Sequence, residues 1–154
     1  MLVSAALSPP ATAKLQSTCF VCGLAHPSGL RIRYDHAGDG LIQARWTPSR
    51  SWEGFQGIVH GGIVSTILDE AMSKAVMAQG YQALTAELKV RFRRPVPPGE
   101  ELEIRGWVTD RFKRRIRTEA VVAGTSGAEF AHAWGVFLAF TGGSPPTGKG
   151  AALR

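Results

Sequence analysis

The stretch GIVHGGIVSTILDEAM at residues 57–72 opens the longest helical pattern in the chain and therefore decides the fold. Apolar residues recur at helical spacing beyond it, and Gly80 is well placed to end the helix. We predict a helix from Gly61 to Gln79, which at about 1.5 Å per residue spans roughly 30 Å and can cross a whole sheet. Its sheet-facing side consists of apolar residues, namely Val64, Ile67, Leu68, Ala71, Met72 and Ala75.

Short strands are predicted on both sides of this helix. Ahead of it, alternation in residues 31–34 and 41–46 around the turn residues AGDG predicts a hairpin. After it, alternating patterns predict four further strands, at 84–93, 101–109, 115–123 and 129–140. The connections between these four are short, which favours an antiparallel meander. The predicted fold class is α+β: a hotdog fold, in which a curled antiparallel sheet of about six strands wraps round one long central helix.

The predicted strand at 84–93 alternates strictly, so its side chains should divide between two faces. One face is apolar and consists of Ala86, Leu88, Val90 and Phe92. The other face is polar and consists of Thr85, Glu87, Lys89, Arg91 and Arg93. A sheet with open edges favours pairing with a second copy, so we expect a homodimer or a dimer of dimers.

Length and composition predict a single soluble domain. The chain has 154 residues, of which 44% are apolar and 19% charged, and no apolar run approaches the ~20 residues that span a bilayer. We expect a flexible N-terminal arm at 1–18, one domain at 19–141 and a disordered tail at 142–154. The start of the chain lacks the features of a secretory signal, so we expect a cytoplasmic protein with no membrane partner.

The net charge of +6 favours anionic partners, and nucleic acid, a membrane surface and phosphorylated small molecules all fit that sign. No helix has a basic face and no aromatic-rich RNA motif is present, so we expect no nucleic-acid partner.

Cys19 and Cys22 form a CxxC pair, but zinc takes about four ligands and only His26 lies close enough to be an obvious third. We therefore expect no metal site, and two small thiols that pack in an N-terminal loop.

Two adjacent acids lie deep in the predicted helix. Glu70 and Lys74 are spaced i,i+4 in the favourable order, so an ion pair accounts for Glu70 without any chemistry. Asp69 has Ser65 and Ser73 at that spacing, and it lies at the edge of the apolar face. A boundary carboxylate without a cation nearby should either contact a group across an interface or take part in catalysis. Asp69 is therefore the candidate functional acid.

The start of the helix adds a second candidate feature. Gly61 and Gly62 follow His60 and leave backbone N–H groups unshielded at the positive end of the helix dipole. Such a start can bind an anion or a developing oxyanion. Close packing of the helix on the sheet is an alternative explanation for the two glycines.

These residues resemble a known family. The segment GIVHGGIVSTILDEAM is similar to the His-Gly-Gly…Asp segment of hotdog-fold acyl-CoA thioesterases of the PaaI-like (phenylacetate-pathway) type. The flanking stretches CFVCGLAHPSGLRIRY and LTAELKVRFRRPVPPGEEL also resemble that family, so the resemblance covers roughly residues 19–140. It implies an enzyme that hydrolyses an acyl-CoA to a free acid and coenzyme A, without a further cofactor.

The resemblance also implies roles for individual residues. Asp69, nine residues after His60, would act as nucleophile or as general base on water, and the Gly61 N–H would polarise the thioester carbonyl. Thr85 would position the water from a second subunit, so that the active site straddles a dimer interface. His60 would orient the loop or contact the substrate. Gln56 stands nearest to an asparagine found in some relatives, although at a different spacing.

Basic residues are expected to bind the phosphates of coenzyme A. The candidates are Arg91, Arg93 and Arg94 in VRFRRP, with the basic stretch 111–117 second, and Gly62 is a further candidate substrate contact. His132 lies on the same face of its predicted strand as several apolar residues and is predicted to be a core histidine.

Two alternative functions remain. One is a hotdog dehydratase, whose catalytic His and acid occupy a different local setting. The other is a non-catalytic acyl-CoA-binding protein, which would gain nothing from a carboxylate near its anion.

Overall fold

The computed structural model describes residues 18–140, and the chain divides between Ile32 and Arg33 into two compact units. In the first unit, the Leu30 N–H donates to the Phe20 carbonyl at 2.8 Å and closes a loop around the two cysteines. Both cysteines are thiols rather than a disulfide. The predicted arm and tail, 1–18 and 142–154, fall almost entirely outside the described residues.

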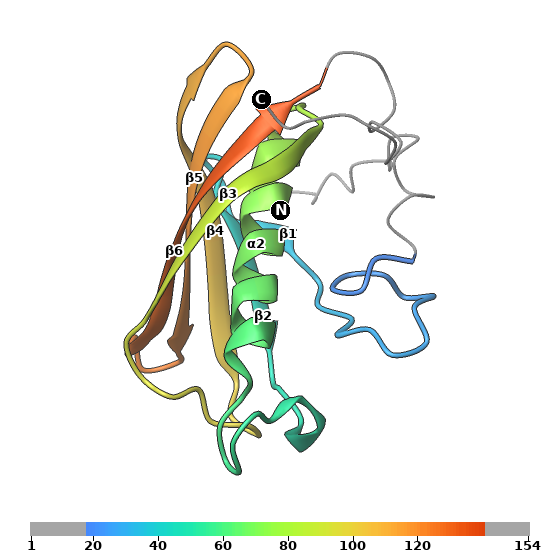
Figure 1. The fold of residues 1–154 in the computed structure, drawn as a ribbon, viewed down its shortest axis with the longest axis vertical. Helices are drawn as coiled ribbons and strands as arrows, with labels where there is room; N and C mark the ends of the chain where they lie inside the picture. Colours follow the sequence, from blue (N-terminus) through green and yellow to red (C-terminus); the bar gives the residue numbers. More distant parts are fainter. Residues whose placement is uncertain (1–17, 141–154) are drawn as a thin grey trace, which may run out of the picture. The chain divides into compact units, whose positions relative to one another are not determined.

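The second unit is a six-stranded antiparallel sheet with one helix against its face (Figure 1). The strands are β1 (Asp35–His36), β2 (Ile42–Trp46), β3 (Ala83–Phe92), β4 (Leu102–Phe112), β5 (Arg115–Gly124) and β6 (Glu129–Ala139). Their order across the sheet is β1-β2-β4-β5-β6-β3, and every neighbouring pair is antiparallel. A short 3-10 helix, η1 (Arg50–Trp52), precedes the long helix α2 (Gly61–Ala78). The α+β hotdog architecture predicted from the sequence is confirmed.

The helix α2 ends within one residue of its predicted limit and buries the predicted face. It packs across β2 to β6, and Gly80 follows its end with a φ of 84°, the left-handed conformation that glycine adopts without strain. The residues buried on α2 are Val64, Ile67, Leu68, Ala71, Met72, Ala75 and Val76. Within the part of the chain that the structure describes, no helix combines the length and the apolar character needed to cross a membrane.

Helix and sheet are in close contact where β4 carries a glycine. A Cβ on Gly106 would lie 2.7 Å from the backbone carbonyl atoms of Ala71, a distance that no side chain tolerates. The missing side chain therefore lets α2 settle onto the sheet at its midpoint. This contact lies two residues from Asp69 in the sequence and fixes the height of the helix there.

Two strand predictions were wrong. The four strands after the helix do not form one meander, because β3 pairs with β6 at an edge of the sheet while β4 lies between β2 and β5. The first hairpin strand is also much shorter than the predicted 31–34. Arg31 has a φ of 55°, which interrupts an extended conformation, and the strand β1 contains only Asp35 and His36.

A bulge changes the alternation of β3. The register with β6 shifts between Thr85 and Glu87, so that Thr85 pairs with Phe137 while Glu87 pairs with Val136. Phe137 is buried on the helix side of the sheet. The bulge therefore turns Thr85 toward α2, whereas strict alternation predicted that it would share the opposite face with Glu87.

Candidate active site

The carboxylate of Asp69 and the hydroxyl of Thr85 lie side by side on facing elements. Asp69 is half-buried on the third turn of α2. Thr85 lies near the start of β3, and its Oγ1 donates a hydrogen bond to Oδ1 of Asp69 at 2.8 Å. Among residues 18–140, Thr85 is the one side chain hydrogen-bonded to Asp69. The resemblance implied a threonine from a second subunit, whereas this hydrogen bond forms within one chain.

The pKa of Asp69 is raised above the ordinary value of an aspartate. Burial is the main cause, because it removes water from the charged form. The hydrogen bond from Thr85 lowers the pKa and so opposes burial, while the adjacent charge of Glu70 raises it further. A carboxylate with a raised pKa is a stronger base than an exposed aspartate, which suits it to accept a proton from water.

The neighbouring polar groups on α2 are engaged elsewhere. Glu70 forms the predicted i,i+4 ion pair with Lys74, at 3.5 Å between Oε1 and Nζ. The Ser65 hydroxyl donates to the Gly61 carbonyl at 2.9 Å rather than to Asp69. The two adjacent acids therefore differ as the sequence predicted: Glu70 has a cation beside it, and Asp69 has none among the described residues.

His60 caps the start of α2. Its Nδ1 accepts a hydrogen bond from the Gly62 N–H at 2.9 Å, and its own backbone N–H donates to the Trp52 carbonyl at 2.8 Å. The Gly62 N–H is therefore occupied by the His60 ring in this structure. The Gly61 N–H has no acceptor among the described residues, because it is the first residue of the helix. One open donor thus lies at the positive end of α2.

A groove of about 340 Å³ runs past this open donor. The helix forms one side of it through Gly61 and Val64, and the segment after β3 forms the other side. The remaining lining residues are Ile58, Val59, Phe92, Arg93, Arg94, Pro95 and Val96. A second hollow of about 330 Å³ adjoins the groove at Gly61 and includes His60 and the exposed Phe55.

The predicted phosphate-binding arginines do not share one location. Arg94 lines the groove and forms no ion pair with another described residue. Arg93 also lines the groove, but its Nε lies 2.7 Å from Oε1 of Glu129. Arg91 pairs in register with His132 and lies on the sheet face opposite the helix, away from the groove. Gln56 is exposed in the loop before α2 and lines neither hollow.

The two candidate features of α2 are too far apart to act on the same bond within one chain. Gly61 and Asp69 are eight residues apart, which corresponds to about 12 Å along a helix axis. Asp69 and Thr85 line neither the groove nor the adjoining hollow. One chain therefore presents two separated candidate half-sites: the hydrogen-bonded pair of Asp69 and Thr85, and an open N–H beside a basic groove.

His132 is not in the core, so that prediction was wrong. Its neighbours Ala131 and Ala133 are fully buried on the helix side of β6, and His132 therefore lies on the outer face of the sheet. Its Nε2 lies 2.8 Å from Oε2 of Glu119, and its ring stacks on Trp134 with centroids 4.3 Å apart. The apolar residues at alternate positions with His132 along β6 therefore cover the outer face of the sheet and not the core.

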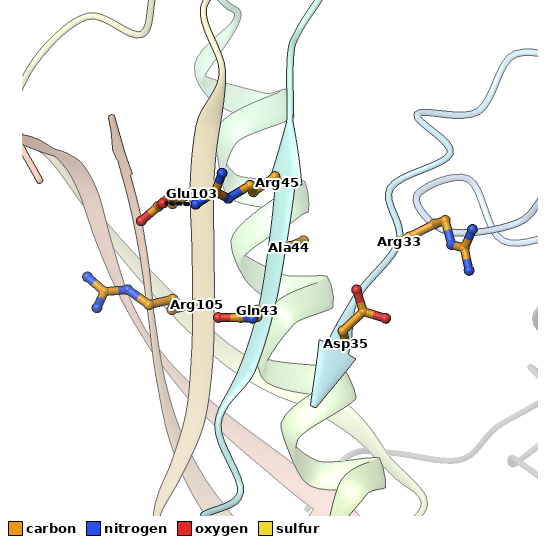
Figure 2. Close-up of a pocket in the computed structure, with 7 residues that line it drawn as sticks. All are labelled: Arg33, Asp35, Gln43, Ala44, Arg45, Glu103 and Arg105. Atoms are coloured by element: carbon orange, nitrogen blue, oxygen red, sulfur yellow. Dashed lines mark hydrogen bonds and ion pairs between the residues drawn. The ribbon is translucent and has the colours of Figure 1, made fainter. Parts of the chain in front are cut away.

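Another hollow, of about 430 Å³, lies at the β1–β2–β4 end of the sheet (Figure 2). It contains three arginines, but Arg45 is held by Glu103 at 3.0 Å. Arg33 and Arg105 point in opposite directions, so their charges do not converge (Figure 2). This hollow does not form a phosphate site comparable with the groove at Gly61.

The sequence missed three contributors to the groove. Phe92 was assigned to the apolar face of its strand, yet it is 52% exposed and lies 3.4 Å from the position of a Cβ on Gly61. Pro95 and Val96 were treated only as the end of the strand, yet they line the groove, and the Val96 carbonyl accepts the Val59 N–H at 2.9 Å. The PVPP stretch after the strand was the available signal, because such a segment must run across the sheet edge before the next strand begins.

Comparisons with known proteins agree with this fold. Residues 56–131 match the model of the thioesterase superfamily. A solved thioesterase superfamily protein is 26% identical with a TM-score of 0.70, over 72% of this chain and 57% of that one. A Bacillus halodurans protein solved with CoA is 28% identical with a TM-score of 0.65, over 73% and 76%. The E. coli PaaI protein of the phenylacetic acid degradation operon is 20% identical with a TM-score of 0.67, over 71% and 83%.

Proposed function

We propose that this chain, which belongs to the thioesterase superfamily, hydrolyses an acyl-CoA thioester to a free acid and coenzyme A. The solved B. halodurans relative holds CoA, which supports the same class of ligand here. The observation that carries the proposal is the hydrogen-bonded pair of Asp69 and Thr85, because a half-buried carboxylate with a raised pKa has the properties of a general base. A protein that only binds CoA has no use for this carboxylate.

The proposed reaction uses the two half-sites together. Asp69 takes a proton from water, and the resulting hydroxide attacks the thioester carbonyl carbon. The Gly61 N–H, at the positive end of α2, stabilises the oxyanion, a contribution typically worth about 3–4 kcal/mol. The carbon–sulfur bond then breaks, and the CoA thiolate leaves and takes up a proton. Direct attack by Asp69, with a mixed anhydride as intermediate, uses the same geometry.

The two half-sites meet across a homodimer. The strand β3 lies at an edge of the sheet over ten residues, so one row of its backbone groups is open to a second strand. Leu88 and Phe92 expose 41% and 52% of their surface beside this edge. A twofold axis that pairs two β3 edges also sets the two helices antiparallel, so the start of one helix comes alongside the middle of the other. Gly61 of one subunit then serves Asp69 and Thr85 of its partner.

The test is the release of coenzyme A from aryl, short, medium and long acyl-CoAs, followed with a thiol reagent. We expect turnover of at least one class, a loss of about 10²–10⁴-fold in Asp69→Asn, and little change in the matched control Glu70→Gln. Near-normal turnover in Asp69→Asn contradicts the role of Asp69. A large loss in Glu70→Gln alone means that the other acid is catalytic.

A further inference from the structure

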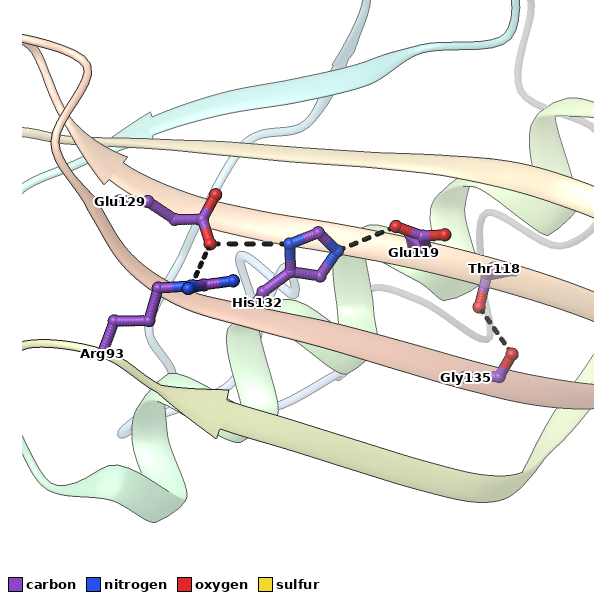
Figure 3. Close-up of polar contacts among 6 residues, drawn as sticks. All are labelled: Arg93, Thr118, Glu119, Glu129, His132 and Gly135. Atoms are coloured by element: carbon purple, nitrogen blue, oxygen red, sulfur yellow. Dashed lines mark hydrogen bonds and ion pairs between the residues drawn. The ribbon is translucent and has the colours of Figure 1, made fainter.

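Four polar side chains form a chain of contacts from the groove to the outer face of the sheet (Figure 3). Arg93 lies at the rim of the groove, with its Nε 2.7 Å from Oε1 of Glu129. The same carboxylate oxygen lies 3.5 Å from Nδ1 of His132, whose Nε2 is 2.8 Å from Oε2 of Glu119. Three of these residues do not line the groove, namely Glu119, Glu129 and His132.

The inner members of this network are largely buried. The Oε1 atom of Glu129 is inaccessible to solvent and accepts no hydrogen bond among the described residues, so its contact with Arg93 is an ion pair. The His132 side chain is 16% exposed, lies between Glu119 and Glu129, and stacks on Trp134. The Arg93 side chain, by contrast, is 48% exposed. An arginine loses much rotamer freedom when it is fixed, so an anchored Nε lowers the entropic cost of binding an anion through the remaining nitrogens.

The backbone ties the same point of β6 to the same arginines. The N–H groups of Arg93 and Arg94 both donate to the Phe130 carbonyl, at 2.7 and 3.1 Å. Glu129 therefore anchors the side chain of Arg93 beside a backbone that is already fixed. Arg93 has no ion-pair partner other than Glu129 among residues 18–140, and it is one of the residues that line the groove.

We propose that Glu129 is a positioning residue for phosphate binding: it holds the Arg93 guanidinium at the rim of the groove, and His132, fixed by Glu119, holds Glu129. The inference rests on the proposed function, because it assigns the charged part of an acyl-CoA to the arginines that line the groove, while the thioester lies at Gly61. Glu129 touches no substrate and acts through Arg93. Its effect should appear in the affinity for a phosphorylated thioester and not in the chemical step.

The decisive experiment compares two thioesters of the same acid, one of coenzyme A and one of N-acetylcysteamine, which has no phosphate. In Glu129→Ala, we expect KM for the CoA thioester to rise roughly tenfold with kcat unchanged, the size of one lost charge-assisted contact. Kinetics with the phosphate-free thioester should not change. Glu129→Gln keeps the shape of the side chain but removes its charge, and because the contact with Arg93 is an ion pair in which Oε1 accepts no hydrogen bond, it should raise KM about as much as Glu129→Ala. Glu129→Asp keeps the charge and should raise KM less than either variant.

A double mutant separates positioning from an independent effect. Arg93→Ala should raise KM as much as Glu129→Ala, and the double variant should be no worse than either. The matched control is Glu103→Ala, which breaks a 3.0 Å ion pair with Arg45 on the same sheet but far from the groove. Additive losses, equal losses with both thioesters, or an unchanged KM in Glu129→Ala each overturn the inference. If Glu129→Ala does not fold, an unchanged KM in Arg93→Ala overturns it equally.

Calorimetric binding of free coenzyme A distinguishes this inference from the proposed function. If the wild-type protein binds CoA, Glu129→Ala weakens that binding and no acyl-CoA is hydrolysed, the positioning role stands and the proposed activity fails. If the wild-type protein hydrolyses acyl-CoA and Glu129→Ala binds CoA normally, the activity stands and the positioning role fails. A wild-type protein that neither binds CoA nor cleaves its thioesters overturns both.

Discussion

The Thr85 hydroxyl lies 2.8 Å from Oδ1 of Asp69, and this hydrogen bond joins the edge strand β3 to the middle of α2. The bond fixes the orientation of the carboxylate and leaves Oδ2 without a side-chain donor among the described residues. It also offsets part of the rise in pKa that burial causes. Thr85 therefore influences both where the base points and the pH at which it is ionised.

Removal of this hydroxyl should change the pH dependence of activity. In Thr85→Val, the pKa of Asp69 should rise further, because the hydrogen bond that favours the carboxylate is lost. Since the base must be ionised to act, the acidic limb of the kcat/KM profile should move to higher pH. Thr85→Ser keeps a donor and should retain the wild-type profile. An acidic limb that does not move in Thr85→Val would show that this hydrogen bond does not tune the base.

The buried carboxylate should make the protein less stable at neutral pH. A raised pKa means that the folded state binds the proton of Asp69 more tightly than the unfolded state, so stability falls as pH rises from the ordinary aspartate pKa through the raised one. Asp69→Asn cannot ionise and should be more stable than wild type above that window, by about 1.4 kcal/mol per unit of raised pKa. Urea unfolding at neutral pH and below the ordinary pKa checks this. The difference should disappear at the lower pH.

The open donor at Gly61 can be removed without a change in side-chain charge. Proline is tolerated at the first position of a helix and has no N–H, and His60 has the φ of −57° and ψ of 132° that a residue before proline adopts. Gly61→Pro should therefore fold and lose about 10²–10³-fold in kcat. A folded Gly61→Pro with normal kcat would exclude this donor from the reaction.

Mixtures of two inactive variants test whether the site is shared. Asp69→Asn and Gly61→Pro each lack a different half-site, so a mixed dimer contains one complete site. After random exchange of subunits, half of the dimers are mixed, and activity should recover to about a quarter of wild type. No recovery, under conditions where exchange is shown by light scattering and a subunit tag, would place both half-sites within one chain.

The imidazole of His60 should be replaceable by another cap. His60→Asn retains a side-chain acceptor for the Gly62 N–H and should keep stability and turnover close to wild type. His60→Ala loses the cap and should lower the free energy of unfolding by about 1 kcal/mol. A large loss of turnover in a stable His60→Asn would instead show that the ring contacts the substrate.

Local patterns predicted the helix and its acids because both depend on neighbours in sequence. The buried face of α2, the stop at Gly80 and the pair of Glu70 with Lys74 follow from helical spacing alone. The remaining features depend on residues far apart in the chain. The pairing of β3 with β6 places Thr85 opposite Phe137, and no local pattern encodes that choice of partner. His132 was misplaced because parity separates two faces of a strand without stating which of them meets the helix.

The glycine at position 106 makes the alignment of the site sensitive to a residue that has no side chain. Ala71 rests against Gly106 with no clearance for even a methyl group, and Asp69 lies half a turn away on the same helix. A methyl group at 106 would lift α2 off the sheet at this point, while Thr85 would stay with β3. The carboxylate and the hydroxyl would then separate although neither had been altered. Activity should therefore be sensitive to substitution of Gly106, although this residue does not contact the reacting atoms.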